Sequence, residues 1–263
     1  MMRWALGIEY EGTCYHGWQS QTNEKLMTVQ RCLEQAVSRV ADHAVEVVCA
    51  GRTDKGVHAT SQVVHFDTAR PRDSRAWVMG VNHGLPEDIR VIWAKEVSED
   101  FHARFSAVAR RYHYIIYNHR IASAILRRHV TWFIHPLDED KMRVAANYLL
   151  GEHDFSAFRG ADCQAKTTRR CVHRLDIVRR GDFIKIDIQA NAFLHHMVRN
   201  IAGVLIEIGV AKRQPVWAQE VLMGRDRKLG GITAPPEGLY LVDITYSPLD
   251  AIPGGRDSVI SPF

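Results

Sequence analysis

The order of strand and helix patterns is the feature that most limits how this chain can fold. Apolar residues alternate along residues 3–10, which is the period of a strand with one buried face. Over residues 28–41 the apolar positions instead share one helical face, and Thr28 is the expected N-cap. The next patterns complete the order β-α-β-β-α-β. Strands are expected at residues 45–49 and 62–68, a helix that stops before Pro86 at 74–85, and a further strand at 89–97.

The second part of the chain has a similar order of patterns. Asp138 is the expected N-cap of a helix that ends before Gly151, and a long helix is expected over residues 195–209. An Arg-Gly-Asp sequence joins two strand patterns as a hairpin. The strands of this part are expected at residues 110–118, 130–134, 173–178, 183–190 and 239–246.

Two such series in tandem favour an α+β fold. Each half is expected to be ferredoxin-like or RRM-like, with a mainly antiparallel sheet and helices on one face. The patterns place the halves at residues 1–105 and 106–247, followed by an irregular Pro/Ser/Gly-rich tail at 248–263. Two halves of this kind would leave a central cleft between them.

Composition excludes several classes of protein. The chain is 46% hydrophobic and 24% charged, which supports a packed core and argues against disorder. It has no apolar run of 18 residues, so we expect no membrane span, and Glu9 and Glu11 interrupt what would be a signal sequence. Five cysteines, an odd number without a CxxC pair, are typical of a reduced, cytoplasmic protein without a zinc ribbon.

The distribution of positive charge indicates a nucleic-acid partner. The net charge is only +4, but basic residues gather in the middle of the chain, several of them beside aromatic rings. This combination suits a polyanion with exposed bases. Any one cluster is typical of an ordinary solvated surface, whereas four in one segment favour nucleic acid; they lie at residues 110–120, 125–129, 166–170 and 179–180.

The sequence AGRTDKGVHA, residues 50–59, contains the strongest candidate for chemistry. It places Asp54 between an arginine and a lysine, directly after a strand pattern. An Asp in a Thr-Asp-x-Gly loop commonly forms a turn, but a carboxylate held ionised by cations is also suited to nucleophilic attack. A metal site formed by Asp54, His58 and His65 is a weaker interpretation, because the sequence places no second carboxylate nearby. An aspartyl-phosphate enzyme is also a weaker interpretation, because such an enzyme needs further carboxylates to bind magnesium and the sequence offers no fitting cluster of them.

Eight segments follow one another in an order and spacing that is far more specific than any one of them. They are YEGTCYHGWQSQ (10–21), VQRCLEQAV (29–37), AGRTDKGVHA (50–59), QVVHFDT (62–68), FHARFSAVARRYHY (101–114), DFSAF (154–158), NAFLHHMVRNIAGVLIEIG (191–209) and EGLYLV (237–242). Together they resemble the tRNA pseudouridine synthase A family.

The resemblance implies an enzyme that isomerises uridine to pseudouridine at positions 38, 39 and 40 of the tRNA anticodon stem-loop. It also implies a homodimer, a catalytic cleft between the halves, and neither cofactor nor metal. By position, Asp54 matches the catalytic aspartate, Tyr112 the active-site tyrosine and Arg199 the arginine that pairs with the aspartate. Arg52 matches an arginine that helps the target base to leave the stack.

The implied reaction explains these residue types. It breaks the N1–C1′ bond, turns the base and rejoins it through C5, so the Asp54 carboxylate would attack either C6 or C1′. Arg199 would keep that carboxylate ionised, and Tyr112 would stack on the uracil and take or relay the C5 proton. The alternative is a tRNA-binding or chaperone protein without chemistry, although a carboxylate on its RNA-facing loop would repel phosphate.

Overall fold

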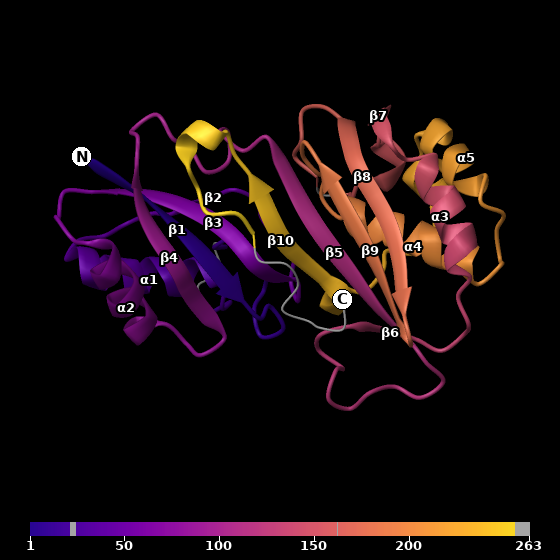
Figure 1. The fold of residues 1–263 in the computed structure, drawn as a ribbon, viewed down its shortest axis with the longest axis horizontal. Coiled ribbons are helices and arrows are strands. Elements are labelled where there is room, and N and C mark those ends of the chain that lie inside the picture. The colour runs from indigo at the N-terminus through magenta and orange to yellow at the C-terminus, as the bar shows by residue number, and fades with distance from the viewer. Residues whose placement is uncertain (22–24, 162, 256–263) are drawn as a thin grey trace. The chain divides into compact units, whose positions relative to one another are not determined.

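The structure, a computed structural model, describes residues 1–21, 25–161 and 163–255 and divides into two compact units (Figure 1). Unit 1 contains Met1–Val108 and the segment that begins at Leu241, and unit 2 contains Ala109–Tyr240. The last strand, β10 (Leu239–Thr245), passes from unit 2 into unit 1.

Unit 1 is a sheet with two helices on one face. The strand order is β4-β1-β3-β10, with β2 on β3, and β1 is antiparallel to both β3 and β4. Trp77 of the second helix contacts Trp4 and Phe66 on the covered face, at ring distances of 6.0 and 5.0 Å. The elements are β1 (Met2–Tyr10), α1 (Val29–Ala41), β2 (Val48–Cys49), β3 (His58–Thr68), α2 (Ser74–Gly84) and β4 (Ile89–Val97).

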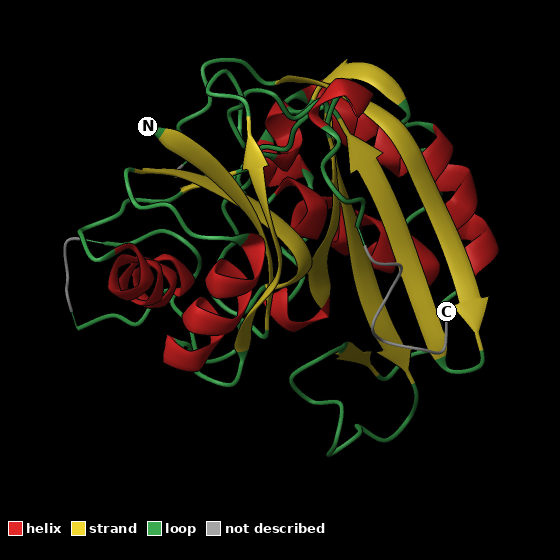
Figure 2. Cartoon of the chain, turned by 60° about the vertical axis from the view of Figure 1, so that its left-hand side comes forward, coloured by secondary structure: helices red, strands yellow, loops and turns green. Residues whose placement is uncertain are grey.

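Unit 2 is likewise a sheet with helices packed on it (Figures 1 and 2). Its strand order is β5-β9-β8-β7, all antiparallel, and β6 runs parallel to β5. Alternate isoleucines of β9 are buried on one face of the sheet. The elements are β5 (Ala109–Asn118), β6 (Thr131–Phe133), α3 (Glu139–Asn147), β7 (Gly151–Asp154), β8 (Arg169–Arg180), β9 (Phe183–Ala190), α4 (Met197–Gly209) and α5 (Trp217–Gly224).

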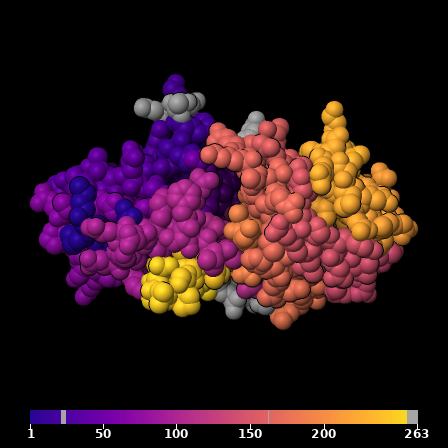
Figure 3. Space-filling model, turned by 90° about the horizontal axis from the view of Figure 1, so that it is seen from above, coloured from indigo at the N-terminus to yellow at the C-terminus, as the bar shows by residue number. Residues whose placement is uncertain are grey.

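The segment after β10 contacts β4 within unit 1. A 3-10 turn at Pro248–Asp250 follows the strand, and residues 251–255 have no regular secondary structure. The Lys95 ammonium on β4 donates to the carbonyl oxygens of Asp250 and Ala251 at 3.2 and 2.6 Å. In Figure 3 this yellow segment lies against the magenta part of unit 1.

The α+β prediction is confirmed, and the differences are local. Only Val48–Cys49 of the expected strand 45–49 is paired, because the N–H groups of Val45 and Val47 bond to side chains of α1 instead. β7 was not expected, since its sequence GEHD has no apolar alternation. No helix in the described part of the chain is long and apolar enough to span a membrane.

The limits of the two units differ from those expected for the two halves. The first division lies at Val108 rather than at residue 105. Residues 241–247, expected in the second half, lie in unit 1, because β10 pairs with β3 there. The expected irregular tail 248–263 includes the 3-10 turn, and its residues 256–263 lie outside the described residues.

Buried His65 generates a prediction for acid stability. Burial, and then the neighbouring His102, lower the pKa of His65 to about 4, while its Nδ1 accepts the Ala103 N–H at 3.1 Å. In the unfolded chain the His65 ring binds a proton near pH 6.5. The site therefore contributes fully to the free energy of unfolding above that pH, and this contribution of about 3 kcal/mol is lost as the pH falls toward 4. Urea unfolding between pH 7 and pH 4 measures it. We expect His65→Gln, which keeps a neutral acceptor, to show a clearly shallower loss, and equal pH dependence in both proteins would contradict the assignment.

Candidate active site

The loop that carries Asp54 connects β2 to β3 in unit 1, and hydrogen bonds fix its backbone on both sides of Arg52. Gln62, which is 0% exposed, accepts from the Gly51 N–H at 3.4 Å and donates to the Gly51 carbonyl at 2.6 Å. The Thr53 hydroxyl bonds to the Tyr10 hydroxyl at 2.7 Å. Because Gly51 and Thr53 are both fixed, the loop is organised before any ligand binds.

Asp54 itself begins a turn. Its carbonyl oxygen accepts the Val57 N–H at 3.2 Å, and Gly56 adopts φ +79°, as position i+2 of a type II turn requires. The turn predicted for Thr-Asp-x-Gly is therefore present, and a main-chain hydrogen bond from Val57 to Asp54 closes it. The Asp54 side chain is half-buried, and its neighbours Arg52 and Lys55 are exposed.

The segment after β1 packs closely on this loop at two glycines. A Cβ at Gly12 would lie 1.9 Å from the Val57 carbonyl oxygen. A Cβ at Gly17 would lie 2.8 Å from the Thr53 carbonyl oxygen, and Gly17 has φ +87°. The next residue, Trp18, donates its N–H to that same oxygen at 3.0 Å. This segment, part of YEGTCYHGWQSQ (10–21), therefore supports the Asp54 loop, a role that its residue pattern does not indicate.

Two histidines considered as metal ligands with Asp54 have other partners. The Nδ1 atom of His58 accepts the Gly12 N–H at 3.0 Å, and the Nδ1 atom of His65 accepts the Ala103 N–H at 3.1 Å. Each ring is therefore oriented by backbone, and Nδ1 is used in both. The geometry gives no support to a metal site that joins these two rings to Asp54.

Tyr112 lies in unit 2, on β5, opposite Ile188 of β9. It is 7% exposed, and its ring meets Phe193 edge-on at 5.0 Å. Its neighbour Tyr114 is fully buried and bonds through its hydroxyl to the Thr131 hydroxyl at 2.6 Å. Burial raises the pKa of Tyr114. The two tyrosines therefore differ, since Tyr114 is anchored within unit 2 and Tyr112 retains slight exposure.

Arg199 lies in the first turn of α4 in unit 2, and its position is fixed by an adjacent segment. Its Nε donates to the Ala234 carbonyl at 2.8 Å, and its own carbonyl accepts the Ala234 N–H at 3.1 Å. One turn along the helix, a Cβ at Gly203 would lie 1.9 Å from the Ile232 carbonyl oxygen. The small residue allows the segment to approach α4, which holds the half-buried Arg199 side chain in one direction.

Some arginines of the basic clusters predicted from the sequence form ion pairs with carboxylates inside unit 2. Arg111 makes a bidentate pair with Asp187, which is 1% exposed, at 2.7 and 2.5 Å. Burial opposes ionisation of Asp187, but the hydrogen bonds from Arg111 and the His113 ring, whose Nε2 lies 3.5 Å from the carboxylate, lower its pKa overall. Arg179 donates to Glu139 at 2.8 Å. These arginines stabilise the fold, so the clusters at 110–120 and 179–180 are only partly available to phosphate.

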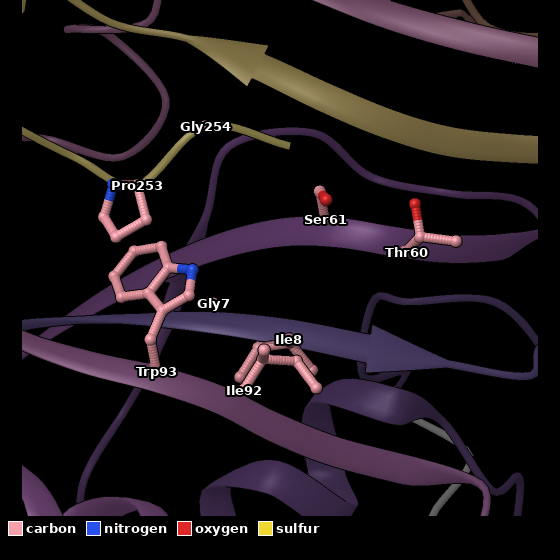
Figure 4. Close-up of a pocket in the computed structure, with 8 residues that line it drawn as sticks. All are labelled: Gly7, Ile8, Thr60, Ser61, Ile92, Trp93, Pro253 and Gly254. Carbon is pink, nitrogen blue, oxygen red and sulfur yellow. The ribbon is translucent and has the colours of Figure 1, made fainter. Parts of the chain in front are cut away.

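A pocket of about 270 Å³ lies in unit 1, and none of the four predicted site residues lines it (Figure 4). The indole of Trp93 covers Gly7, where a Cβ would lie 2.1 Å from the ring nitrogen. The register of β1 shifts against β4 between Gly7 and Ile8, and against β3 between Ile8 and Tyr10. These irregularities frame the pocket. Its lining residues are Gly7, Ile8, Thr60, Ser61, Ile92, Trp93, Pro253 and Gly254.

Comparison with known proteins agrees with these features. Residues 7–106 and 145–247 match the family described as tRNA pseudouridine synthase. A protein named tRNA pseudouridine synthase A from Coxiella burnetii is 57% identical over 253 residues, covering 96% of each chain. Proteins of the same name from Alcanivorax borkumensis and Legionella pneumophila are 56% and 55% identical, covering 96% and 93% of this chain and 94% and 93% of their own. The chain belongs to the tRNA pseudouridine synthase family.

Proposed function

We propose that this protein isomerises uridine to pseudouridine in tRNA. The observation that carries the proposal is the Asp54 loop, in which a half-buried carboxylate stands between two exposed cations on a backbone fixed at Gly51 and Thr53. Membership of the family gives this geometry its chemical meaning. A passive tRNA-binding protein has no evident use for a carboxylate fixed at this place, where it would repel phosphate.

In the proposed reaction the Asp54 carboxylate is the nucleophile, with C6 of the uracil or C1′ of the ribose as its target. The N1–C1′ bond breaks, the base turns, and a C5–C1′ bond forms. The C5 proton leaves and N1 ends with a proton, so atoms and electrons balance without an oxidant, a cofactor or a metal. A fixed loop suits this sequence of steps because the detached base must meet the same carboxylate throughout.

Three further residues have proposed roles around the nucleophile. Arg199, held by Ala234, would pair with the carboxylate during catalysis and keep it ionised. Tyr112 would stack on the uracil and take or relay the C5 proton. Arg52, exposed on the same loop as Asp54, would fill the place that the target base vacates, since unstacking that base costs a few kcal/mol.

The substrate is proposed to be the anticodon stem-loop, with modification at positions 38, 39 and 40, as the resemblance implies. The compartment is proposed to be the cytoplasm. All five cysteines are free thiols, as a reducing compartment maintains them. The protein is proposed to act as a homodimer, because one 29.9 kDa chain is small to hold both a stem-loop and the body of a tRNA.

Replacement of Asp54 tests the proposed activity directly. Unmodified tRNA is incubated with the protein, and pseudouridine is mapped by carbodiimide-stop sequencing. We expect the wild-type protein to modify positions 38–40 and Asp54→Asn to form no product while still binding tRNA, because only the nucleophile is lost. Asp100→Asn, at an exposed carboxylate of unit 1, serves as the control and should remain active. Activity of Asp54→Asn within tenfold of wild type would rule out the nucleophile.

Tyr112→Phe separates stacking from proton transfer. If the hydroxyl takes or relays the C5 proton, single-turnover release of tritium from [5-³H]uridine-labelled tRNA should slow by roughly 10²–10⁴, with tRNA binding unchanged. The matched control is Tyr114→Phe. It loses the bonds to Thr131 and to the Pro235 carbonyl, so it should lower stability by about 1–3 kcal/mol and leave the rate per folded molecule near wild type. Near-normal release of tritium by Tyr112→Phe would exclude the proton-transfer role and leave Tyr112 only the role of stacking on the uracil.

Light scattering at micromolar concentration tests the homodimer. The expected mass is twice that of the 29.9 kDa chain. A fully active monomer under the conditions of the activity assay would contradict the proposal.

A further inference from the structure

An exposed aromatic ring stands on a rigid turn of unit 1, between β4 and β5. Phe105 is 76% exposed, which is unusual for a side chain of its size. The turn beneath it is closed twice, since the Ser106 N–H donates to the His102 carbonyl and the His102 N–H donates to the Ser106 hydroxyl, both at 2.9 Å. The His102 Nδ1 accepts the N–H groups of Arg104 and Phe105, each at 3.2 Å. The exposed ring is therefore held rather than loosely attached.

Two neighbours line up with the Phe105 ring. The His102 ring lies 4.3 Å from it, centre to centre, with 31° between the planes. The Arg104 guanidinium carbon lies 5.6 Å from the Phe105 ring centre. Burial, as the larger cause, and nearby arginines lower the pKa of His102. At neutral pH the cluster is thus a pair of closely packed, tilted aromatic rings with one cation over the exposed Phe105 ring.

Buried side chains of unit 1 contact the turn that carries Phe105. The His102 ring lies 4.7 Å from that of His65, which is buried and accepts the Ala103 N–H. The Ala103 carbonyl accepts the Tyr246 hydroxyl at 2.7 Å. Both main-chain groups of Ala103, in the middle of the turn, are therefore fixed by buried side chains.

The turn lies near the proposed active-site loop within the same unit. Burial raises the pKa of the Cys49 thiol to about 12, and the guanidinium groups of Arg52 and Arg104 both act against that rise. The geometry agrees, because Val48 of β2 pairs with His65, whose ring contacts His102 of the turn, and Cys49, the last residue of β2, precedes the Asp54 loop. Two arginines on this side of unit 1 give it charge complementary to an RNA backbone.

We propose that Phe105, with His102 and Arg104, forms a stacking platform for an unpaired nucleobase of the RNA substrate, beside the Arg52 loop. The inference rests on the proposed function. Every base presents a π face to an aromatic ring, and an arginine beside the ring adds attraction to both base and phosphate. The platform would hold a base that neighbours the reacting uridine, which helps the substrate to remain open while the target is turned out.

The test compares Phe105→Ala with Phe105→Trp, each in the Asp54→Asn background so that tRNA is bound but not consumed. We expect Phe105→Ala to weaken filter binding of unmodified tRNA by roughly tenfold to a hundredfold, and Phe105→Trp to stay within about threefold of its parent. Met79→Ala on α2 is the matched control, because Met79 is a large apolar residue of unit 1 that is 63% exposed. The affinity of the Met79→Ala protein for tRNA should be unchanged.

Salt dependence distinguishes stacking from charge. Phe105→Ala should keep the slope of log affinity against log salt, whereas Arg104→Gln should reduce its magnitude by about one, the effect of one lost phosphate contact. An unchanged affinity of Phe105→Ala for tRNA would overturn the platform. So would a change of molecular mass in light scattering, since that would assign the ring to an interface between copies of the chain.

Crosslinking keeps the platform and the enzyme activity separable. A photoreactive benzoylphenylalanine placed at position 105 of the otherwise wild-type chain should crosslink to one nucleotide of tRNA, and the same group at position 79 should not. A crosslink from a protein that forms no pseudouridine would refute the proposed function and retain an RNA platform. Pseudouridine formation without a crosslink at position 105 would refute the platform alone.

Discussion

The two hydrogen bonds between Gln62 and Gly51 are the interaction on which the proposed site most depends. Gln62 lies in the interior of β3 with no exposed surface, and its amide satisfies both the N–H and the C=O of one loop residue. A buried peptide group left without partners costs about 1–3 kcal/mol for each unmade bond, so the loop has one strongly preferred position. That position directs Arg52 outward and starts the Asp54 turn two residues later.

On its opposite side the loop is held by close backbone packing rather than by a buried polar side chain. Gly12 and Gly17 let a second backbone segment touch the loop where any Cβ would collide with a carbonyl oxygen. The Trp18 N–H then bonds to the Thr53 carbonyl, and Tyr10 bonds to the Thr53 side chain. With Gln62 on one side and this segment on the other, the turn has little room to move. Such a fixed backbone suits the role proposed for Asp54, since the detached base would meet the same carboxylate throughout.

Periodic elements were predictable from the sequence, and long-range polar contacts were not. The strand at residues 89–97 and the Thr28 cap of α1 follow from local pattern and are confirmed. The strand at 45–49 was wrong at its start because side chains of α1, distant in sequence, take the N–H groups of Val45 and Val47. Propensity cannot indicate such competition, since it depends on where a helix side chain reaches in the folded unit.

The candidate residues show the same division. Residue type and neighbours identify Asp54 as a candidate nucleophile, and the family resemblance singles out Tyr112 and Arg199. The supports of these side chains come from far along the chain: Ala234 for Arg199 and Phe193 for Tyr112. Arg111, which belongs to the basic cluster at residues 110–120, pairs with a carboxylate 76 positions away.

That last pair has a consequence for Tyr112. Along β5 successive side chains point to opposite faces, so Arg111 reaches Asp187 on one face while Tyr112 meets Phe193 on the other. A slip of one residue against β9 would exchange these faces, bringing an arginine to the isoleucines of β9 and taking Arg111 away from the buried Asp187, which would keep the longer 3.3 Å contact to Arg174 of β8. A buried charge that loses its bidentate partner costs several kcal/mol. A buried ion pair adds little net stability compared with an apolar pair of the same size, but here it penalises the wrong register. The charge on one face of the sheet thus fixes which face presents the tyrosine.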